Sequence, residues 1–117
     1  LPLGEPSTLI DHRGGEGGLD GAVVDAEGRI WNARWGAGCI DCYAPDGTRL
    51  RTVAVPASRP TCPLFVGPDL DRILVTSAQE GMDEAARRAE PQAGMTFLLD
   101  LPGVRGLPQP RVRLVAP

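Results

Sequence analysis

Three cysteines and one histidine are the residues that could bind a transition metal or do redox chemistry. Cys39-Ile-Asp-Cys42 has the C-x-x-C spacing of a redox motif or of half a zinc site, and Cys62 stands alone. No second pair completes a zinc set, because His12 is the only histidine. The segment also alternates like a strand, in which residues three apart point to opposite faces. We therefore interpret Cys39 and Cys42 as ordinary strand cysteines, with zinc or redox use as the alternative.

Nucleophilic and general-base chemistry has few candidates. His12 lies in a glycine-rich loop, which favours a surface residue, with a catalytic base as the alternative. Thr76 and Ser77 carry hydroxyls but have no histidine partner for a triad, which excludes a serine-hydrolase mechanism.

Several carboxylates invite an interpretation as an acid–base or metal-binding pair. Glu27 and Asp46 lie in predicted turns, where such side chains are commonly solvated. Asp25 ends the strand that Asp20 opens, so the two lie far apart. We therefore expect Asp25→Ala to leave any activity nearly intact.

The elements that must position these residues are short strands between turn signals. Over residues 20–56 the turns are Glu27-Gly28, Gly36-Ala37-Gly38 and Asp46-Gly47, the last a strong hairpin signal. The predicted strands of this unit are residues 22–25, 29–35, 39–43 and 50–55, and Pro56 closes the unit.

The same order of turns and strands restarts over residues 61–116. Arg29-Ile30-Trp31 and Arg72-Ile73-Leu74 lie 43 residues apart, within the repeat length of a four-stranded propeller blade. The predicted strands are 63–66, 72–76, 94–100 and a possible final one at 112–115, with a surface helix inserted over 82–90. Asp83 is the predicted N-cap of this helix and Pro91 stops it.

The pattern predicts an all-β chain: part of a β-propeller, about two and a half blades of four antiparallel strands. Residues 1–19, with a strand-like stretch at 7–10, end a preceding blade; 20–56 form one blade and 61–116 the next. Trp31, Trp35 and Phe65 are expected in the core between blades, with the channel mouth as an alternative for Trp35. Such a set of blades leaves sheet edges unpaired, so we expect either a fragment of a longer propeller or assembly with further copies. The first residue, Leu1, favours the fragment.

The amino-acid composition bears on the fold class, on binding to nucleic acid or membranes, and on the compartment. The 15 glycines and 12 prolines indicate many tight turns rather than a helical bundle. The 12 basic residues are scattered arginines and the net charge is −3, which argues against nucleic-acid binding. No apolar run is long enough to span a membrane. The odd cysteine count favours a reducing compartment, so we expect a cytoplasmic location, with a periplasmic one as the alternative.

The segment Leu19-Asp20-Gly21-Ala22-Val23-Val24-Asp25-Ala26-Glu27-Gly28-Arg29-Ile30-Trp31 resembles the (Pro)-Asp-Gly-x-x-x-Asp-x-x-Gly-x-Ile/Leu-Trp motif of one hydrolase family. This is the family of senescence marker protein, gluconolactonase and luciferin-regenerating enzyme. The likeness continues in order through the segments at residues 33–36, 59–63, 75–78, 91–94 and 103–108. Leu19 replaces the usual proline.

The resemblance implies a six-bladed propeller that opens a sugar lactone with the help of one divalent cation: Ca²⁺, Mg²⁺, Mn²⁺ or Zn²⁺. Asp20 matches the family's Asp-Gly ligand, so it is the expected metal ligand and catalytic residue. A turn-capping role is the alternative. The family's glutamate and asparagine ligands come from upstream blades, which this chain lacks. We therefore expect no lactonase activity from the 117 residues alone. The rival function is a non-catalytic propeller segment with a binding or structural role.

Overall fold

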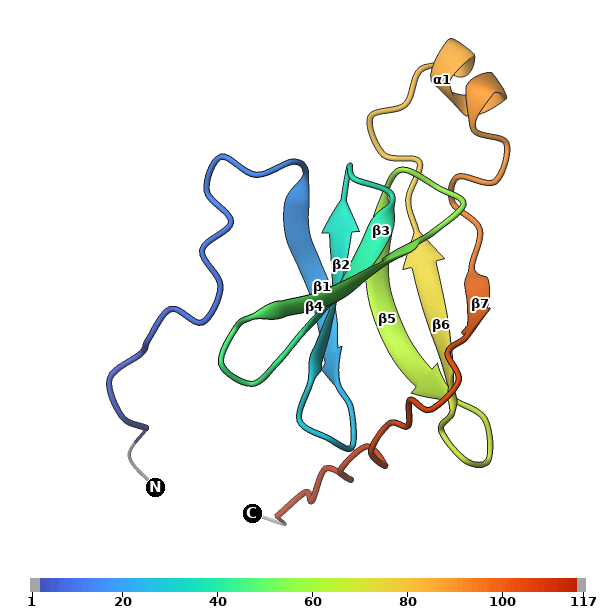
Figure 1. Ribbon diagram of the computed structural model, residues 1–117. Coiled ribbons are helices and arrows are strands. Elements are labelled where there is room, and N and C mark those ends of the chain that lie inside the picture. The colour runs from blue at the N-terminus through green and yellow to red at the C-terminus, as the bar shows by residue number, and fades with distance from the viewer. Residues whose placement is uncertain (1–2, 116–117) are drawn as a thin grey trace.

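Two antiparallel sheets form the body of the computed structural model, which describes residues 3–115 (Figure 1). The first sheet is a meander of β1 (Gly18–Val24), β2 (Ile30–Trp35), β3 (Cys39–Tyr43) and β4 (Arg49–Ala54). The second contains β5 (Pro60–Val66), β6 (Arg72–Ser77) and β7 (Phe97–Asp100). The predicted all-β class and the pairing of the first two strands are confirmed.

The core lies between the two sheets. The first sheet contributes Trp31 and Ile40 and the second contributes Ile73 and Val75, all fully buried. Phe65 joins them and is 5% exposed. Since side chains alternate along a strand, each sheet turns one row of apolar residues toward the other. Trp31 and Phe65 therefore occupy the core positions expected from the sequence.

Two predicted strands are absent from the described part of the chain. Residues 7–10 form no strand and bend at Leu9, and residues 112–115 run on as an exposed tail. A strand needs a neighbour for its backbone groups, and Pro108 and Pro110 supply no N–H ahead of the tail. The second sheet therefore has three strands, and the expectation of four was wrong. The predicted segments 1–19 and 61–116 begin and end, respectively, outside the described residues.

The inserted helix was predicted correctly. α1 (Glu84–Ala89) begins after Asp83, whose side chain accepts a 2.8 Å hydrogen bond from the Ala86 backbone N–H. None of its residues is buried, and Figure 1 shows the helix standing away from both sheets. It is a surface element that contributes nothing to the core. Among residues 3–115, no helix is long and apolar enough to cross a membrane.

A C-terminal clasp, residues 101–106, fastens the second sheet to the β1–β2 turn. The Ala26 N–H donates to the Arg105 carbonyl over 2.8 Å, and Asp25 forms a bridge with Gly106. Gly106 also donates to the Leu70 carbonyl over 2.7 Å. An added Cβ at Gly106 would lie 2.3 Å from the Phe65 ring, so only glycine fits there. The clasp thus links one end of each sheet.

Candidate functional site

Asp20 lies near the start of β1 with its side chain exposed. The β1–β2 ladder shifts register here: Leu19 pairs with Arg34, whereas Ala22 pairs with Asn32. Asp20 and Gly21 together therefore oppose the single residue Ala33, which makes a β-bulge. Bulges often re-aim side chains beside functional sites. Sequence analysis placed Asp20 on this strand but gave no sign of the bulge.

Gly21 brings β1 against β5, the first strand of the other sheet. A Cβ at Gly21 would lie 2.7 Å from the Thr61 carbonyl oxygen and 2.8 Å from the Cys62 Sγ. Any side chain here would push the two first strands apart. The backbone of β1 beside Asp20 therefore lies close against β5.

Asn32 is a site residue that the sequence did not point to. Its side chain is 6% exposed, and its Nδ2 donates to the carbonyls of Asp20, at 2.8 Å, and Gly21, at 3.3 Å. Within residues 3–115, Asn32 Oδ1 is the one buried side-chain oxygen without a hydrogen-bond partner. A buried acceptor left unpaired costs about 1–3 kcal/mol. The strand pattern shows only a polar residue at a buried position, which was the available signal.

Asp25 belongs to the packing of the molecule rather than to its chemistry. The carboxylate is fully buried and accepts from Trp31 Nε1 at 2.9 Å and Arg29 Nε at 2.7 Å. The backbone N–H groups of Glu27 and Arg29 complete its partners. Burial by itself raises the pKa of Asp25, but these hydrogen bonds outweigh burial and leave the pKa below its ordinary value. The expectation for the activity of Asp25→Ala stays a prediction, but the variant should lose stability, because it leaves the buried Trp31 indole N–H and Arg29 without their partner.

A second buried carboxylate, Asp41, lies on the opposite face of the first sheet from the core. Arg34 Nε lies 3.0 Å from it, and the hydroxyls of Tyr43 and Thr52 donate to it. Burial, together with the charge of Asp41, raises the pKa of Tyr43. These side chains bond to one buried carboxylate, an arrangement typical of a structural cluster. Sequence analysis did not identify it.

The C-x-x-C cysteines are separated as the alternation predicts. Cys42 belongs to the hydrophobic core, whereas Cys39 accepts from Arg34 Nε at 3.3 Å. Burial raises the pKa of the Cys42 thiol, so it stays protonated at neutral pH. The two cysteines are buried and lie on opposite faces of the sheet, so they are not placed to form a disulfide with each other or to bind one zinc ion together. Cys62 is exposed on β5.

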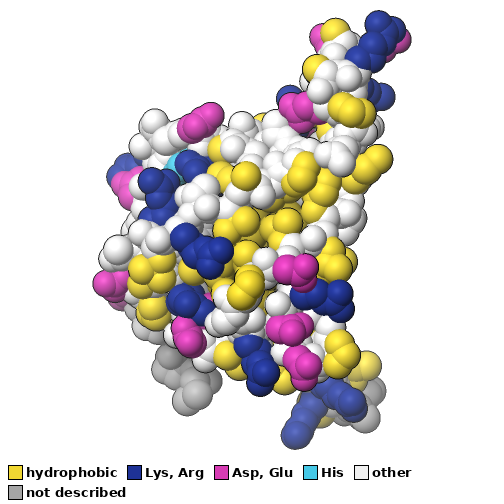
Figure 2. All heavy atoms as spheres, turned by 45° about the vertical axis from the view of Figure 1, so that its right-hand side comes forward, with side chains coloured by type: hydrophobic (Ala, Val, Ile, Leu, Met, Phe, Trp, Pro, Cys, Tyr) yellow, Lys and Arg dark blue, Asp and Glu magenta, His cyan; other side chains and the backbone are white. Residues whose placement is uncertain are grey.

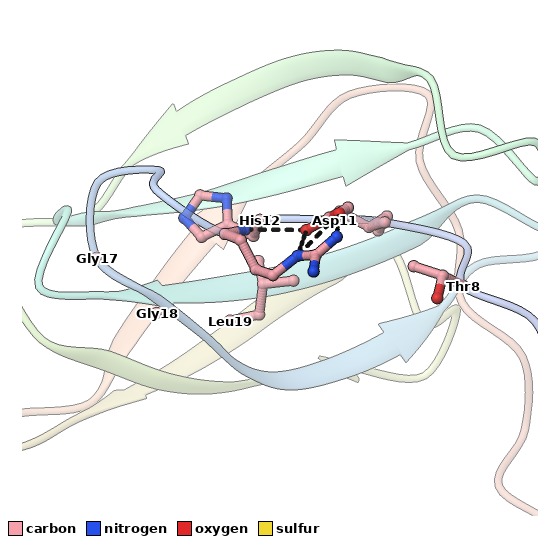
Figure 3. Close-up of a pocket in the computed structure, with 8 residues that line it drawn as sticks. Thr8, Asp11, His12, Gly17, Gly18 and Leu19 are labelled. Atoms are coloured by element: carbon pink, nitrogen blue, oxygen red, sulfur yellow. Dashed lines mark hydrogen bonds and ion pairs between the residues drawn. The ribbon is translucent and has the colours of Figure 1, made fainter.

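His12 lines a pocket in the N-terminal segment together with Thr8, Asp11 and Leu19 (Figure 3). Its Nε2 lies 3.0 Å from the Glu16 carbonyl, which can only accept, so Nε2 carries the proton. The ring packs against Gly15, where an added Cβ would lie 2.5 Å from it. The pocket does not include Asp20. His12 thus closes its own loop, in agreement with the surface interpretation.

The remaining candidates have structural partners. Ser77 donates to the Met95 carbonyl over 2.5 Å, and the hydroxyls of Thr76 and Thr61 lie 2.6 Å apart. Trp35 is half-buried beneath the Arg59 guanidinium, 4.8 Å from the ring centroid. None of these groups is hydrogen-bonded to His12 among the described residues.

The described residues supply one candidate ligand for a divalent cation, but not a complete set of ligands. Asp20 offers a hard carboxylate oxygen, which suits Ca²⁺ or Mg²⁺, and none of the ion pairs between described residues includes it. Within residues 3–115, no group of three or more His, Cys, Asp or Glu side chains could hold a metal ion. Further ligands would have to come from outside this part of the molecule.

Comparison with solved structures identifies close neighbours. The chain superposes with a TM-score of 0.91 on a regucalcin from Agrobacterium tumefaciens strain C58, described as a calcium-binding protein. The two are 50% identical, and the match covers 97% of this chain and 38% of the other. A luciferin-regenerating enzyme matches with a TM-score of 0.71 and 28% identity, over 84% of this chain and 33% of that one.

Some of the sequence relatives are named for lactone chemistry. The "Putative sugar lactone lactonase" of Rhizobium meliloti (strain 1021) is 54% identical over 97% of this chain and 38% of its own length. The L-arabinolactonase of Azospirillum brasilense is 40% identical over 71% of this chain and 27% of its own. The chain therefore spans only 38% and 27% of the length of these two relatives. The family model for the SMP-30/gluconolactonase/LRE-like region matches residues 2–79, and the chain belongs to that family.

Proposed function

We propose that this chain is the C-terminal part of a six-bladed propeller that hydrolyses a sugar lactone with one divalent cation, and that Asp20 is one of the cation's ligands. The observation that carries the proposal is the exposed Asp20 carboxylate at a bulge, in a chain 54% identical to a relative named as a lactonase. The arabinolactonase and the calcium-binding regucalcin support the substrate class and the cation respectively.

The arrangement of the sheets supports the propeller. Each sheet begins with a strand, β1 or β5, and these two first strands meet at Gly21. Blades placed around an axis bring their first strands together in this way. The outer face of the second sheet supports further blades, since Leu64, Leu74 and Leu98 form a cross-strand row there.

This leucine row is partly exposed to solvent in the described chain. Leu64 is 41% and Leu98 is 51% exposed, and apolar side chains gather on the face of the molecule that carries the second sheet (Figure 2). Exposed apolar patches of this kind mark surfaces that another layer covers. In the proposed full-length protein the covering layer is the neighbouring blade. That protein would be of the size of the relatives, of which this chain matches 38%.

The proposed chemistry is ring opening by water. A divalent cation, when bound, polarises a carbonyl and makes water more acidic. Asp20 contributes a negatively charged oxygen that holds the cation, and the bulge fixes the backbone from which this carboxylate projects. Hydrolysis then gives the open-chain acid.

Two substitutions of Asp20 in the full-length protein test the proposal. Asp20→Ala removes the ligand, so turnover of a sugar lactone should fall by about two orders of magnitude or more, since the polarisation is worth several kcal/mol. Asp20→Asn keeps the shape and a neutral oxygen and should weaken Ca²⁺ binding less than Ala does. Asp46→Ala removes an exposed carboxylate in the β3–β4 turn and should leave both properties unchanged. If Asp20→Ala turned over the lactone at the native rate, the proposed role of Asp20 would be refuted.

The calcium-binding neighbour favours a second candidate: cation binding without hydrolysis. It shares 50% of its residues with this chain at a TM-score of 0.91, so a cation-binding propeller with no lactonase role is a real rival. Measuring Ca²⁺ affinity and lactone turnover on the same preparation separates the two functions. Binding that depends on Asp20, without turnover of any sugar lactone tested, would favour the rival. For the 117 residues alone we expect neither strong binding nor turnover.

A further inference from the structure

At the bulge of Asp20 and Gly21, the backbone carbonyls accept hydrogen bonds from a side chain of the neighbouring strand. A bulge leaves the extra residue out of the ladder, so its carbonyls need other partners. Both carbonyls accept from one nitrogen, Nδ2 of Asn32, at 2.8 Å and 3.3 Å. The reverse orientation of the amide would bring Oδ1 against two oxygens, so the hydrogen-bond geometry fixes it. Asn32 therefore holds two successive peptides of the bulge, Asp20–Gly21 and Gly21–Ala22.

The Oδ1 atom of Asn32 is placed less favourably than its Nδ2 atom. Oδ1 is buried without a partner among the described residues, although the side chain is 6% exposed. Asn32 faces away from the core, on the side of the sheet that carries Asp41, its partner in the β2–β3 ladder. The amide is present despite its unpaired oxygen, which indicates that its donor end is what matters.

The second sheet contains the same device without a carboxylate. Its register shifts between Pro60 and Cys62, which leaves Thr61 as the extra residue of β5. Thr76 lies opposite Cys62, as Asn32 lies opposite Ala22. The Thr76 hydroxyl lies 2.6 Å from that of Thr61 and 3.4 Å from the Cys62 carbonyl. In both sheets, a polar side chain on the second strand holds the bulge of the first.

We propose that Asn32 is a positioning residue for Asp20: by holding both carbonyls of the bulge, it fixes which residue is bulged out and so where the carboxylate lies. This inference rests on the proposed role of Asp20. A slip of one residue in a strand exchanges its two faces. If the bulge moved by one position, Asp20 would leave the side of the sheet on which it now lies. Asn32 and the tight contact of Gly21 with β5 together prevent that slip.

The test compares two isosteric variants in the full-length protein. Asn32→Thr keeps a hydroxyl that can donate to the bulge, as Thr76 does, whereas Asn32→Val has the same shape and no donor. We expect Asn32→Val to weaken Ca²⁺ binding about tenfold or more and Asn32→Thr to stay within about threefold of native. Amide hydrogen exchange at Gly21 and Ala22 should be faster in Asn32→Val than in Asn32→Thr, with or without Ca²⁺. Asn32→Val is expected to fold, because valine is no larger than asparagine and the change removes a buried oxygen that has no partner among the described residues.

Thr52→Val is the matched control. It removes a side-chain hydrogen bond to Asp41 on the same face of the same sheet but leaves the bulge untouched, so Ca²⁺ affinity and exchange at Gly21 should stay native. Equal affinity and equal exchange in the Thr and Val variants of Asn32 would overturn the positioning role, with Asp20→Asn still weakened. Native Ca²⁺ affinity in Asp20→Asn would instead overturn the proposed role of Asp20 and the positioning role with it.

Discussion

Gly21 is the residue at which the two sheets come closest beside Asp20. We expect Gly21→Ala to destabilise the protein by about 1–3 kcal/mol, because the added methyl meets the Thr61 carbonyl and must separate β1 from β5. Chemical denaturation measures the loss. Gly18→Ala is the matched control on the same strand, because an added Cβ there meets nothing within 4 Å. Equal stability of the two variants would contradict the close contact at Gly21.

Asp25 supports the fold through Trp31 and Arg29. Removing one partner of a buried ion pair is costly, so Asp25→Ala should lower the free energy of unfolding by about 3 kcal/mol. Activity per folded molecule should change little. Asp46→Ala is the control, since that exposed carboxylate accepts only from the Thr48 N–H. A stability loss in Asp25→Ala no larger than in Asp46→Ala would contradict the buried network.

The lowered pKa of Asp25 also predicts a pH dependence. A carboxyl with a depressed folded-state pKa contributes its full stability above the unfolded value of about 3.9, and the contribution is lost as pH falls through the folded pKa. The stability gap between the native protein and Asp25→Asn should therefore be widest near neutral pH and narrow below about pH 4. Urea unfolding at several pH values measures the gap. A gap that stays constant down to pH 2 would refute the charge-based account.

At the scale of elements, the helix α1 buries none of its residues. Asp83 caps its start, and Glu90 after its end accepts a 3.0 Å hydrogen bond from the Ser58 N–H. Losing the cap costs about 1 kcal/mol of helix stability. We expect Asp83→Ala to speed amide exchange at Arg87 and Glu90 while the unfolding midpoint of the sheets stays within experimental error. A drop in that midpoint would show that α1 supports the core.

The sequence predicted those elements whose causes are local. The Asp46-Gly47 turn, the alternation of β2 and the Asp83 cap each depend on a few neighbouring residues, and all are present as expected. The strands expected at 7–10 and 112–115 failed because a strand needs a partner, and pairing is not a local property.

The candidate site was predicted only in part for the same reason. Asp20 could be singled out by its motif, and the sequence placed it correctly on β1. The bulge, the donor role of Asn32 and the burial of Asp25 depend on how strands align and what covers them. A polar residue at a buried strand position, such as Asn32 or Asp41, was the only trace of these features in the sequence.

At the scale of the whole molecule, the leucine row on the second sheet distinguishes a part from a complete fold. Leu98→Lys in the isolated chain replaces a half-exposed side chain, so its stability should change by no more than about 0.5 kcal/mol. In the full-length protein the neighbouring blade should cover Leu98, and the buried charge should cost about 3 kcal/mol or more. Leu50→Lys on β4, which lies outside the row, is the comparison variant. The same small effect of Leu98→Lys in both proteins would contradict a covering blade.

The C-terminal clasp has a consequence for how the molecule is made. During translation the chain leaves the ribosome from its N-terminus, at about 5–20 residues per second, so β1 to β6 emerge before residues 101–106. The first hairpins can pair as they appear, but the Ala26–Arg105 and Gly106–Leu70 hydrogen bonds cannot form until residues 101–106 are out. Until then Phe65 lacks its cover from Gly106, so the two sheets cannot be joined at this end while the chain is still being made.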